Sequence, residues 1–346
     1  MKLLQKPKLL LAIIVFGALF VIGLAGGALG DAFGLGFLGA PIAALQLPAE
    51  PISSEPNIGG FHITNTMITT WASIVILMVL GFVATRKIKE VPTGFQNVFE
   101  VIIEYFQKLG EGISGKRSTQ YIPLVMTIFL FILVANWIGV LPGFGTIGWI
   151  ETPEELIHHA EEHHKDLSQV KLNVFDGSGD IGILGFGSVS DTVTAEEWEH
   201  DHHIIDEGKQ AGVLIPFLRS ANTDINTTLA IALVAMFFVH FWALRTLGFS
   251  SHAKKYINFK QGPIWFAVGI LELISEVGRV ISFTFRLFGN IFAGEVLLVA
   301  MAFLIPIIGI MPFIGLELFV GLIQAYVFSM LTLVFASVAG AAHDDH

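Results

Sequence analysis

The sequence contains no cysteine and few charged residues. Without cysteine, the 346-residue chain can form neither a disulfide nor a thiolate metal site, and it has no cysteine nucleophile. Only 14% of the residues are charged, whereas 53% are hydrophobic and the mean hydropathy is +0.71. A typical soluble domain carries about 25% charged residues. The composition therefore excludes an ordinary soluble domain and indicates a polytopic membrane protein.

The negative charge is concentrated in one segment. Between Glu151 and Phe217 there are fifteen acidic residues and three lysines, a net charge of −12 in a chain whose total is −10. The remainder of the chain is therefore slightly positive. The acidity belongs to a single loop and gives no sign of a nucleic-acid partner.

Long apolar runs predict five to six transmembrane helices, because a bilayer core takes roughly 20 apolar residues as a helix. Pro306 and Pro312, with Gly309 and Gly315 nearby, divide the last apolar run into two helices. We therefore predict an all-α polytopic membrane protein. The candidate spans are 9–29, 67–85, 120–141, 225–247 and the divided run 263–340.

Lysines and arginines in alternate loops predict the orientation. The segments before the first span, between the second and third, and between the fourth and fifth are all basic, so they are expected in the cytoplasm. The segment 31–66 and the acidic, histidine-rich insertion 146–215 then lie on the outer side. The transmembrane regions 67–145 and 216–340 follow these segments, and the tail 341–346 is cytoplasmic.

Two segments each allow two interpretations. Residues 1–30 have a basic start, an apolar centre and small residues at Ala28 and Gly30, which fits either a membrane anchor or a cleavable signal peptide. Residues 94–113 mix apolar and charged positions at helical spacing. They predict an amphipathic helix, either at the cytoplasmic membrane surface or packed as a connector.

The predicted fifth span carries a polar stripe. At 100° per residue, five other side chains lie within about 40° of Arg286. Glu295 lies about 180° away, and Glu317 and Gln324 share one face of the last helix. A single buried Ser or Asn more often only packs, but several ionisable residues within a membrane usually mark an ion path. The stripe consists of Glu272, Ser275, Arg279, Ser282, Arg286 and Asn290.

The predicted orientation divides these groups into two routes. Glu272, Ser275 and Ser282 fall on the cytoplasmic side of Arg286, whereas Glu295 and Glu317 fall on the outer side. A continuous pore has no use for a fixed cation in its middle. A two-sided proton device needs one, and arginine retains its charge where a buried lysine can lose its proton.

These residues resemble a known family. The stretch "RLFGNIFAGE" (286–295) is similar to the central motif of subunit a of the membrane sector, Fo, of rotary F-type ATP synthases. Three further stretches resemble the same family, and together the resemblance covers roughly 60–145 and 211–340. They are "LVANWIGVLPG" (133–143), "NTDINTTLAIAL" (222–233) and "LIQAYVFSMLTLVF" (322–335).

The resemblance implies a role for each group. Arg286 would face the carboxylate of each passing c-ring subunit, with the last two helices long, tilted and paired against the ring. Glu272 and Ser282 match positions on the cytoplasmic side. Many members carry a histidine in place of one of the two outer glutamates. The outer half-channel would comprise Asn290, Glu295, Glu317 and Gln324.

The resemblance also implies the surroundings of the chain. The partners would be the c-ring, subunit b of the peripheral stalk, other ATP synthase subunits and lipid, in the bacterial inner membrane. No cofactor is expected. The chain would not be an enzyme by itself, because it has no GxxxxGK[ST] motif and nucleotide chemistry would lie in other subunits. The sequence does not decide between H⁺ and Na⁺.

Two other functions remain open. A stand-alone secondary transporter or ion channel could use the same buried charges, although a second copy of "RLFGN", of the kind internal repeats would supply, is absent from the sequence. The insertion holds seven histidines, of which His159 and His163 are candidate metal ligands at i, i+4 spacing. A solvated acidic insertion explains them as well. A metal-binding surface protein with membrane anchors would leave Arg286 unexplained.

Overall fold

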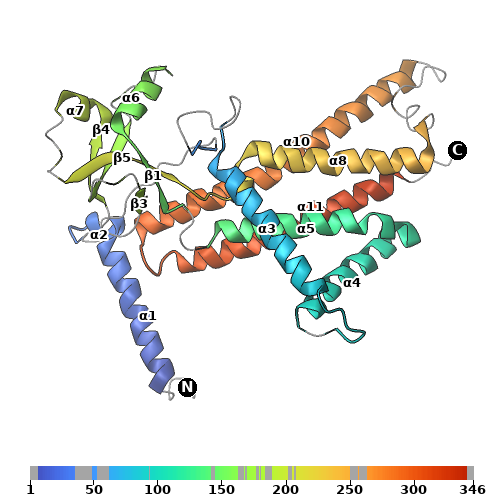
Figure 1. The fold of residues 1–346 in the computed structure, drawn as a ribbon, viewed down its shortest axis with the longest axis horizontal. Helices are drawn as coiled ribbons and strands as arrows, with labels where there is room; N and C mark the ends of the chain where they lie inside the picture. Colours follow the sequence, from blue (N-terminus) through green and yellow to red (C-terminus); the bar gives the residue numbers. More distant parts are fainter. Residues whose placement is uncertain are drawn as a thin grey trace. The chain divides into compact units, whose positions relative to one another are not determined.

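The computed structural model is drawn in Figure 1, and its helices and strands belong to two compact units. The first unit comprises Met1–Ile68, Gly139–Arg219 and Phe292–Leu318, and the second comprises Thr69–Ile138, Ser220–Ile291 and Phe319–His346. The residues that the structure describes are 7–35, 49–52, 62–92, 94–141, 145–162, 167, 170–176, 179, 181–183, 189–201, 205, 208–249, 256 and 263–340.

Five helices within these residues are long and apolar enough to cross a membrane. Many of their large apolar side chains are exposed, as expected where lipid covers them. The five predicted spans from residue 67 onward and the all-α polytopic class are confirmed. The helix α1 (Pro7–Gly26) occupies most of the predicted first span, with an apolar part, Leu10–Gly26, shorter than the other five. Those five are α3 (Asn65–Thr85), α5 (Ile122–Gly139), α8 (Ile225–Leu247), α10 (Pro263–Leu304) and α11 (Met311–Ala339).

The break between α10 and α11 falls at the predicted proline and glycine positions. α10 ends at Leu304, shortly before Pro306, which lacks the N–H that a continuing helix needs. Ile307 follows with a φ of 72°, a left-handed conformation that β-branched residues rarely adopt. Pro312 is the second residue of α11, where the first helical turn tolerates proline.

The core of the second unit holds α10 by one face. Phe283, Leu287 and Ile291 are buried there at four-residue spacing, among residues of α5, α8 and α11. Phe283 stacks on Phe328 of α11 with ring centroids 4.5 Å apart. The polar stripe lies about 100° around α10 from these buried residues, where Ser282 and Asn290 are exposed and Arg286 is half-buried.

A buried amide network fixes the register of this core. Asn136 on α5 donates from Nδ2 to the carbonyl oxygen of Gly321 on α11 at 3.3 Å. Its Oδ1 accepts from Nδ2 of Asn222 at 2.6 Å. Asn222 lies in the short 3-10 helix η3 (Ala221–Thr223) just before α8. Buried hydrogen bonds between side chains favour one arrangement of the helices, although Oδ1 of Asn222 is buried without a partner among the described residues.

The predicted helix at 94–113 is α4 (Phe95–Ser114), which the 3-10 helix η1 (Gly115–Gln120) follows. One side of α4 packs into the core, where Phe106 is buried, and a Cβ added at Gly110 would meet Ser118. Phe95, Val98 and Tyr105 remain exposed. The helix therefore combines a packed face with an apolar exposed one.

The insertion contains a five-stranded antiparallel sheet in the first unit that the sequence analysis did not predict. The strand order is β3-β1-β5-β2-β4. The all-α class holds for the membrane helices, and the sheet is an addition to it. The strands are β1 (Ile147–Glu151), β2 (Lys171–Asp176), β3 (Ile181–Ile183), β4 (Val189–Thr194) and β5 (Lys209–Pro216).

Two short helices cover part of this sheet. Leu156 of α6 (Pro153–Glu162) and Trp198 of α7 (Ala195–His200) pack with Leu172, Ala211 and Val213 from β2 and β5. Thr194 and Glu197 form a capping box at the start of α7, in which each side chain bonds the other residue's backbone N–H. The small α2 (Ala28–Asp31) precedes this region in the chain.

The length of α10 predicts a steep tilt in the membrane. Its 42 residues rise roughly 63 Å at 1.5 Å each, about twice a hydrocarbon core of roughly 30 Å. The helix is unbroken, so we expect it to cross obliquely or to project well beyond the core. α8, with 23 residues, should lie closer to the membrane normal. A structure of the complete complex in a lipid nanodisc measures both angles, and an α10 as upright as α8 would contradict the prediction of a tilt.

Candidate functional site

Arg286 lies on the face of α10 that carries the polar stripe, and its guanidinium has one hydrogen-bond partner among the described residues. The guanidinium is half-buried, and Nη2 donates to Oγ of Ser282 at 3.3 Å. Within the described residues no carboxylate lies within ion-pair distance of Arg286. The other predicted members of the stripe nearby, Ser275, Ser282 and Asn290, are exposed. The stripe thus places a permanent cation beside exposed polar side chains, without a carboxylate partner among the described residues.

Glu295, predicted for the outer route, is held by an arginine that the sequence analysis missed. Arg219 donates from Nε to Oε1 and Oε2 of Glu295 at 3.1 and 3.3 Å, and from Nη2 to Oε2 at 3.2 Å. The side chain of Arg219 is only 3% exposed. Two-nitrogen contacts of this kind hold a carboxylate in one orientation. One feature of the sequence could have drawn attention to Arg219: it is an isolated cation between the apolar end of β5 and the apolar helix α8.

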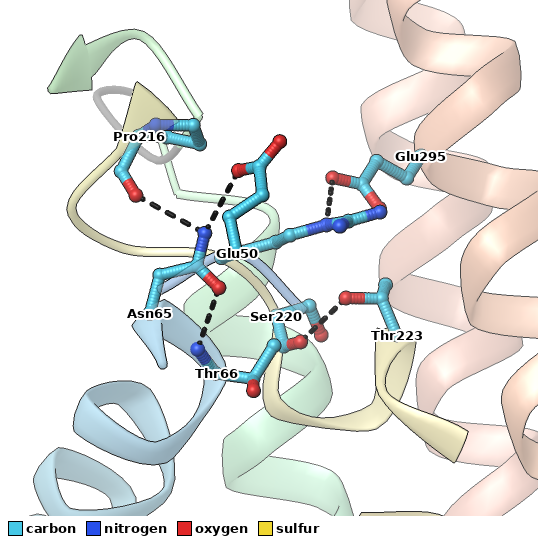
Figure 2. A network of polar contacts seen from close by, with 8 residues as sticks. Glu50, Asn65, Thr66, Pro216, Ser220, Thr223 and Glu295 are labelled. Carbon is cyan, nitrogen blue, oxygen red and sulfur yellow. Dashed lines mark hydrogen bonds and ion pairs between the residues drawn. The ribbon is translucent and has the colours of Figure 1, made fainter. Parts of the chain in front are cut away.

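Glu50 completes this cluster from the segment before α3, near the start of the chain (Figure 2). Its carboxylate accepts a hydrogen bond from Nδ2 of Asn65 at 3.1 Å, and Asn65 also donates to the carbonyl oxygen of Pro216 at 3.2 Å. Burial raises the pKa of Glu50 to about 7, although Arg219 and the Asn65 hydrogen bond act in the opposite direction. A carboxyl that titrates near neutral pH therefore lies beside the Arg219–Glu295 pair.

Glu317 is buried on α11, and its carboxylate lies against the backbone of Gly294. A Cβ added at Gly294 would overlap that carboxylate, so the absence of a side chain at Gly294 is what admits it. Within the described residues Glu317 makes neither an ion pair nor a hydrogen bond. Gln324 is half-buried seven residues further along α11. Glu317 thus lies beside Gly294, the residue before Glu295. That the two carboxylates themselves approach each other stays a prediction.

A second set of ionisable groups precedes Arg286 on α10. Arg279 donates from Nη1 to Oε1 of Glu276 at 2.6 Å and lies 3.9 Å from Glu272. His240 of α8 approaches the other oxygen of Glu276 at 3.7 Å, and Tyr256 donates to Oε1 at 3.5 Å. Glu272 was predicted for the cytoplasmic route. Glu276 and His240 were missed because Glu276 is off the predicted stripe and His240 is a single residue in another span.

The histidine candidates for a metal fall outside what the structure describes. His163 and the side chain of His159 belong to residues that are not described. Across the described part of the chain, no group of three or more His, Asp or Glu residues could hold a metal ion. The metal interpretation of the insertion stays a prediction.

The geometry along α10 is therefore a cation with titratable groups before and after it. Glu276 precedes Arg286 by ten residues and Glu295 follows by nine, which are roughly 15 and 14 Å along a helix axis. Each of these carboxylates has a cation partner in this chain, Arg279 and Arg219 respectively. Such an arrangement can pass protons toward and away from a fixed charge, provided that an external group meets Arg286.

Comparisons with known proteins agree with the family resemblance of the sequence. A family model described as "ATP synthase A chain" matches residues 67–337. The chain is 32% identical to "ATP synthase subunit a" of Gloeobacter violaceus, over 88% of this chain and 99% of that protein. The protein of the same description from Solidesulfovibrio magneticus is 27% identical, over 87% of this chain and 95% of its own length.

A third relative with that description, from Helicobacter hepaticus, is 29% identical over 83% of this chain and 91% of its own length. The family model covers most of the chain, including α3, α5, α8, α10 and α11, and thus every residue from Glu272 to Gln324 that the sequence assigned to a proton route. On the extent of this match, the chain belongs to the ATP synthase A chain family.

Proposed function

We propose that this chain is the proton-conducting stator subunit of an F-type ATP synthase. The observation that carries the proposal is the state of Arg286: a half-buried permanent cation within an apolar helix long enough to cross a membrane, without a carboxylate partner in the described residues. A charge in that position is costly unless something neutralises it. The missing counter-charge is proposed to be the carboxylate of a c-ring subunit.

The physics of a rotating carboxyl explains why the cation must be fixed. A protonated carboxyl is neutral and can face lipid, whereas an ionised one suffers a large desolvation penalty there. Opposite Arg286 the ionised form finds its counter-charge, so the proton leaves. Because the guanidinium stays protonated, it also repels protons that would pass directly between the two sides.

Two half-channels would serve this exchange. On the cytoplasmic side we assign Glu272, Ser275 and Ser282, with the contact between Glu276 and the half-buried His240 as an addition. The outer half-channel would comprise Asn290, Glu295, Glu317 and Gln324. Arg219 would orient Glu295, and Glu50 would lie nearer the outer water. The basic loops support this orientation. Subunit b of the peripheral stalk and the remaining ATP synthase subunits would complete the complex in the bacterial inner membrane.

Replacement of Arg286 tests the proposal directly. Arg286→Ala should abolish coupled ATP synthesis and ATP-driven pumping while the complex still assembles. Arg286→Lys should also fail, because a buried lysine can lose its proton and lacks the planar fork. Arg245→Ala is the matched control, since Arg245 is an exposed cation in the last turn of α8. Normal coupled synthesis in an assembled Arg286→Ala complex would refute the assignment. Pumping assays with and without sodium identify the ion.

The placement of Glu317 predicts that two different substitutions have the same effect. Glu317→Gln removes a titratable group, and Gly294→Ala keeps every titratable group but pushes a methyl into the Glu317 carboxylate. Both should slow passive proton conduction through the membrane sector. Gly315→Ala is the control, because a Cβ at Gly315 meets nothing within 4 Å. If Glu317→Gln and Glu295→Gln both conduct like the parent at every pH, the outer half-channel is wrongly assigned.

The raised pKa of Glu50 predicts a pH-dependent stability. The folded chain keeps this carboxyl protonated up to a pKa of about 7, whereas the unfolded chain releases the proton near the ordinary glutamate pKa of 4.5. Stability should therefore fall as the pH rises between these values, by on the order of 3 kcal/mol at most. Glu50→Gln should remove this loss, giving a higher apparent melting temperature than the parent at pH 8 and an equal one at pH 4. Parallel melting curves for parent and variant across pH would contradict the role of burial.

A further inference from the structure

The sheet of the first unit exposes a compact apolar surface, which we name the β1–β3 patch. In the antiparallel pair of β1 and β3, Ile147 is opposite Ile183 and Trp149 is opposite Ile181. Directly paired residues point to the same face of a sheet, as do residues two apart on one strand. The four side chains therefore form one block. They are exposed by 42% (Ile147), 40% (Trp149), 63% (Ile181) and 61% (Ile183).

The rest of the same sheet face is covered by the chain itself. Trp149 pairs with Ile215 of β5, so Ala211 and Val213, at two-residue steps along β5, share its face. Ala211 and Val213 are buried under α6 and α7. The face is thus apolar from Ile147 to Ala211, with the charged Glu151 and Lys209 toward its other end. The two helices pack on its residues from β2 and β5, whereas the four residues of the β1–β3 patch stay exposed.

The β1–β3 patch is also close in the sequence to the spans α5 and α8. β1 pairs with the second half of β5, Val213–Pro216, whereas β2 pairs with the first half, Lys209–Gly212. Beyond the strands, Phe217 donates to the carbonyl oxygen of Ile147 at 3.0 Å, and Gly145 to that of Leu218 at 3.1 Å. The pairing therefore continues toward the two chain ends that enter α5 and α8.

The short connections keep the patch near the bilayer. Seven residues separate the end of α5 at Gly139 from Ile147, and eight separate Pro216 from the start of α8 at Ile225. Seven residues reach at most about 25 Å even when fully extended. Because Ile147 belongs to the patch, the patch cannot lie far from the membrane surface on that side.

We propose that the β1–β3 patch inserts into the interfacial region of the lipid bilayer and anchors the sheet to the membrane surface. Tryptophan is enriched at that depth because its ring is apolar and its N–H is polar. Charged residues are absent from 145–150 and from β3, whereas the acidic residues of the insertion belong largely to α6, α7 and the segments around them. An apolar block of this kind left in water would favour association. Lipid is the partner that the nearby spans already provide.

The absence of cysteine gives a direct test. Ile183→Cys and Thr192→Cys place single labels on the two edge strands, β3 and β4, at an exposed position in each case. Each variant is assembled into the complete ATP synthase, labelled with the environment-sensitive fluorophore NBD and reconstituted in liposomes that contain lipids with nitroxides near the headgroup. The parent complex, treated in the same way, gives the background from other subunits.

The Ile183 label should emit at shorter wavelength and be quenched by the nitroxide lipids. The Thr192 label should behave as in water and be quenched by iodide instead. Adding Ile181→Asp should weaken lipid quenching at Ile183 and leave the Thr192 label unchanged. Iodide quenching at Ile183 equal to that at Thr192 would overturn the proposal. A shifted emission without lipid quenching would overturn it too, because a protein partner would then cover the patch. Neither measurement depends on proton transport.

Discussion

The constraint on which the molecule depends is the permanent charge of Arg286 in a helix that is otherwise apolar. Arginine cannot escape burial by losing its proton, so its charge must be matched by another group. Among the described residues, the chain offers this guanidinium one hydrogen-bond acceptor, Oγ of Ser282, and no carboxylate. The core that holds α10 by Phe283 and Leu287 leaves this face open. The charge is thus left for a partner to neutralise.

Two other arginines show that the same fold can neutralise a cation completely. Arg219 is buried and grips Glu295 through two nitrogens. Arg279 holds Glu276 at 2.6 Å and lies over the ring of Phe335, 4.9 Å from its centroid. Removal of one partner from such a pair is strongly destabilising when it leaves the other charge buried without compensation. Arg286 differs from these two arginines, because it has no carboxylate partner among the described residues. The lack of a partner is therefore particular to Arg286 and is not shared by every arginine of the chain.

The sheet adds a feature that composition concealed. Its segment carries most of the chain's negative charge, which suggests a solvated loop when charge alone is counted. The strands are nevertheless short runs such as "KLNVFD" and "AGVLIP", whose Val, Leu and Ile residues favour extended structure. These runs are separated by acidic stretches and paired out of sequence order, β5 lying between β1 and β2. Such pairing depends on contacts between distant residues, which local pattern does not reveal.

The sequence alone determined the membrane class, the spans from residue 67 onward, the helix at 94–113 and the break near Pro306, because each depends on local hydropathy or on proline geometry. It also singled out Arg286, Glu295 and Glu317, because ionisable residues are conspicuous in apolar runs. Only the tertiary structure decided which charges are paired. Arg219 meets Glu295 across 76 residues, Glu50 reaches the same cluster from the start of the chain, and His240 approaches Glu276 from another helix. Long-range contacts of this kind follow from how helices and strands pack, and packing leaves no periodic trace in the sequence.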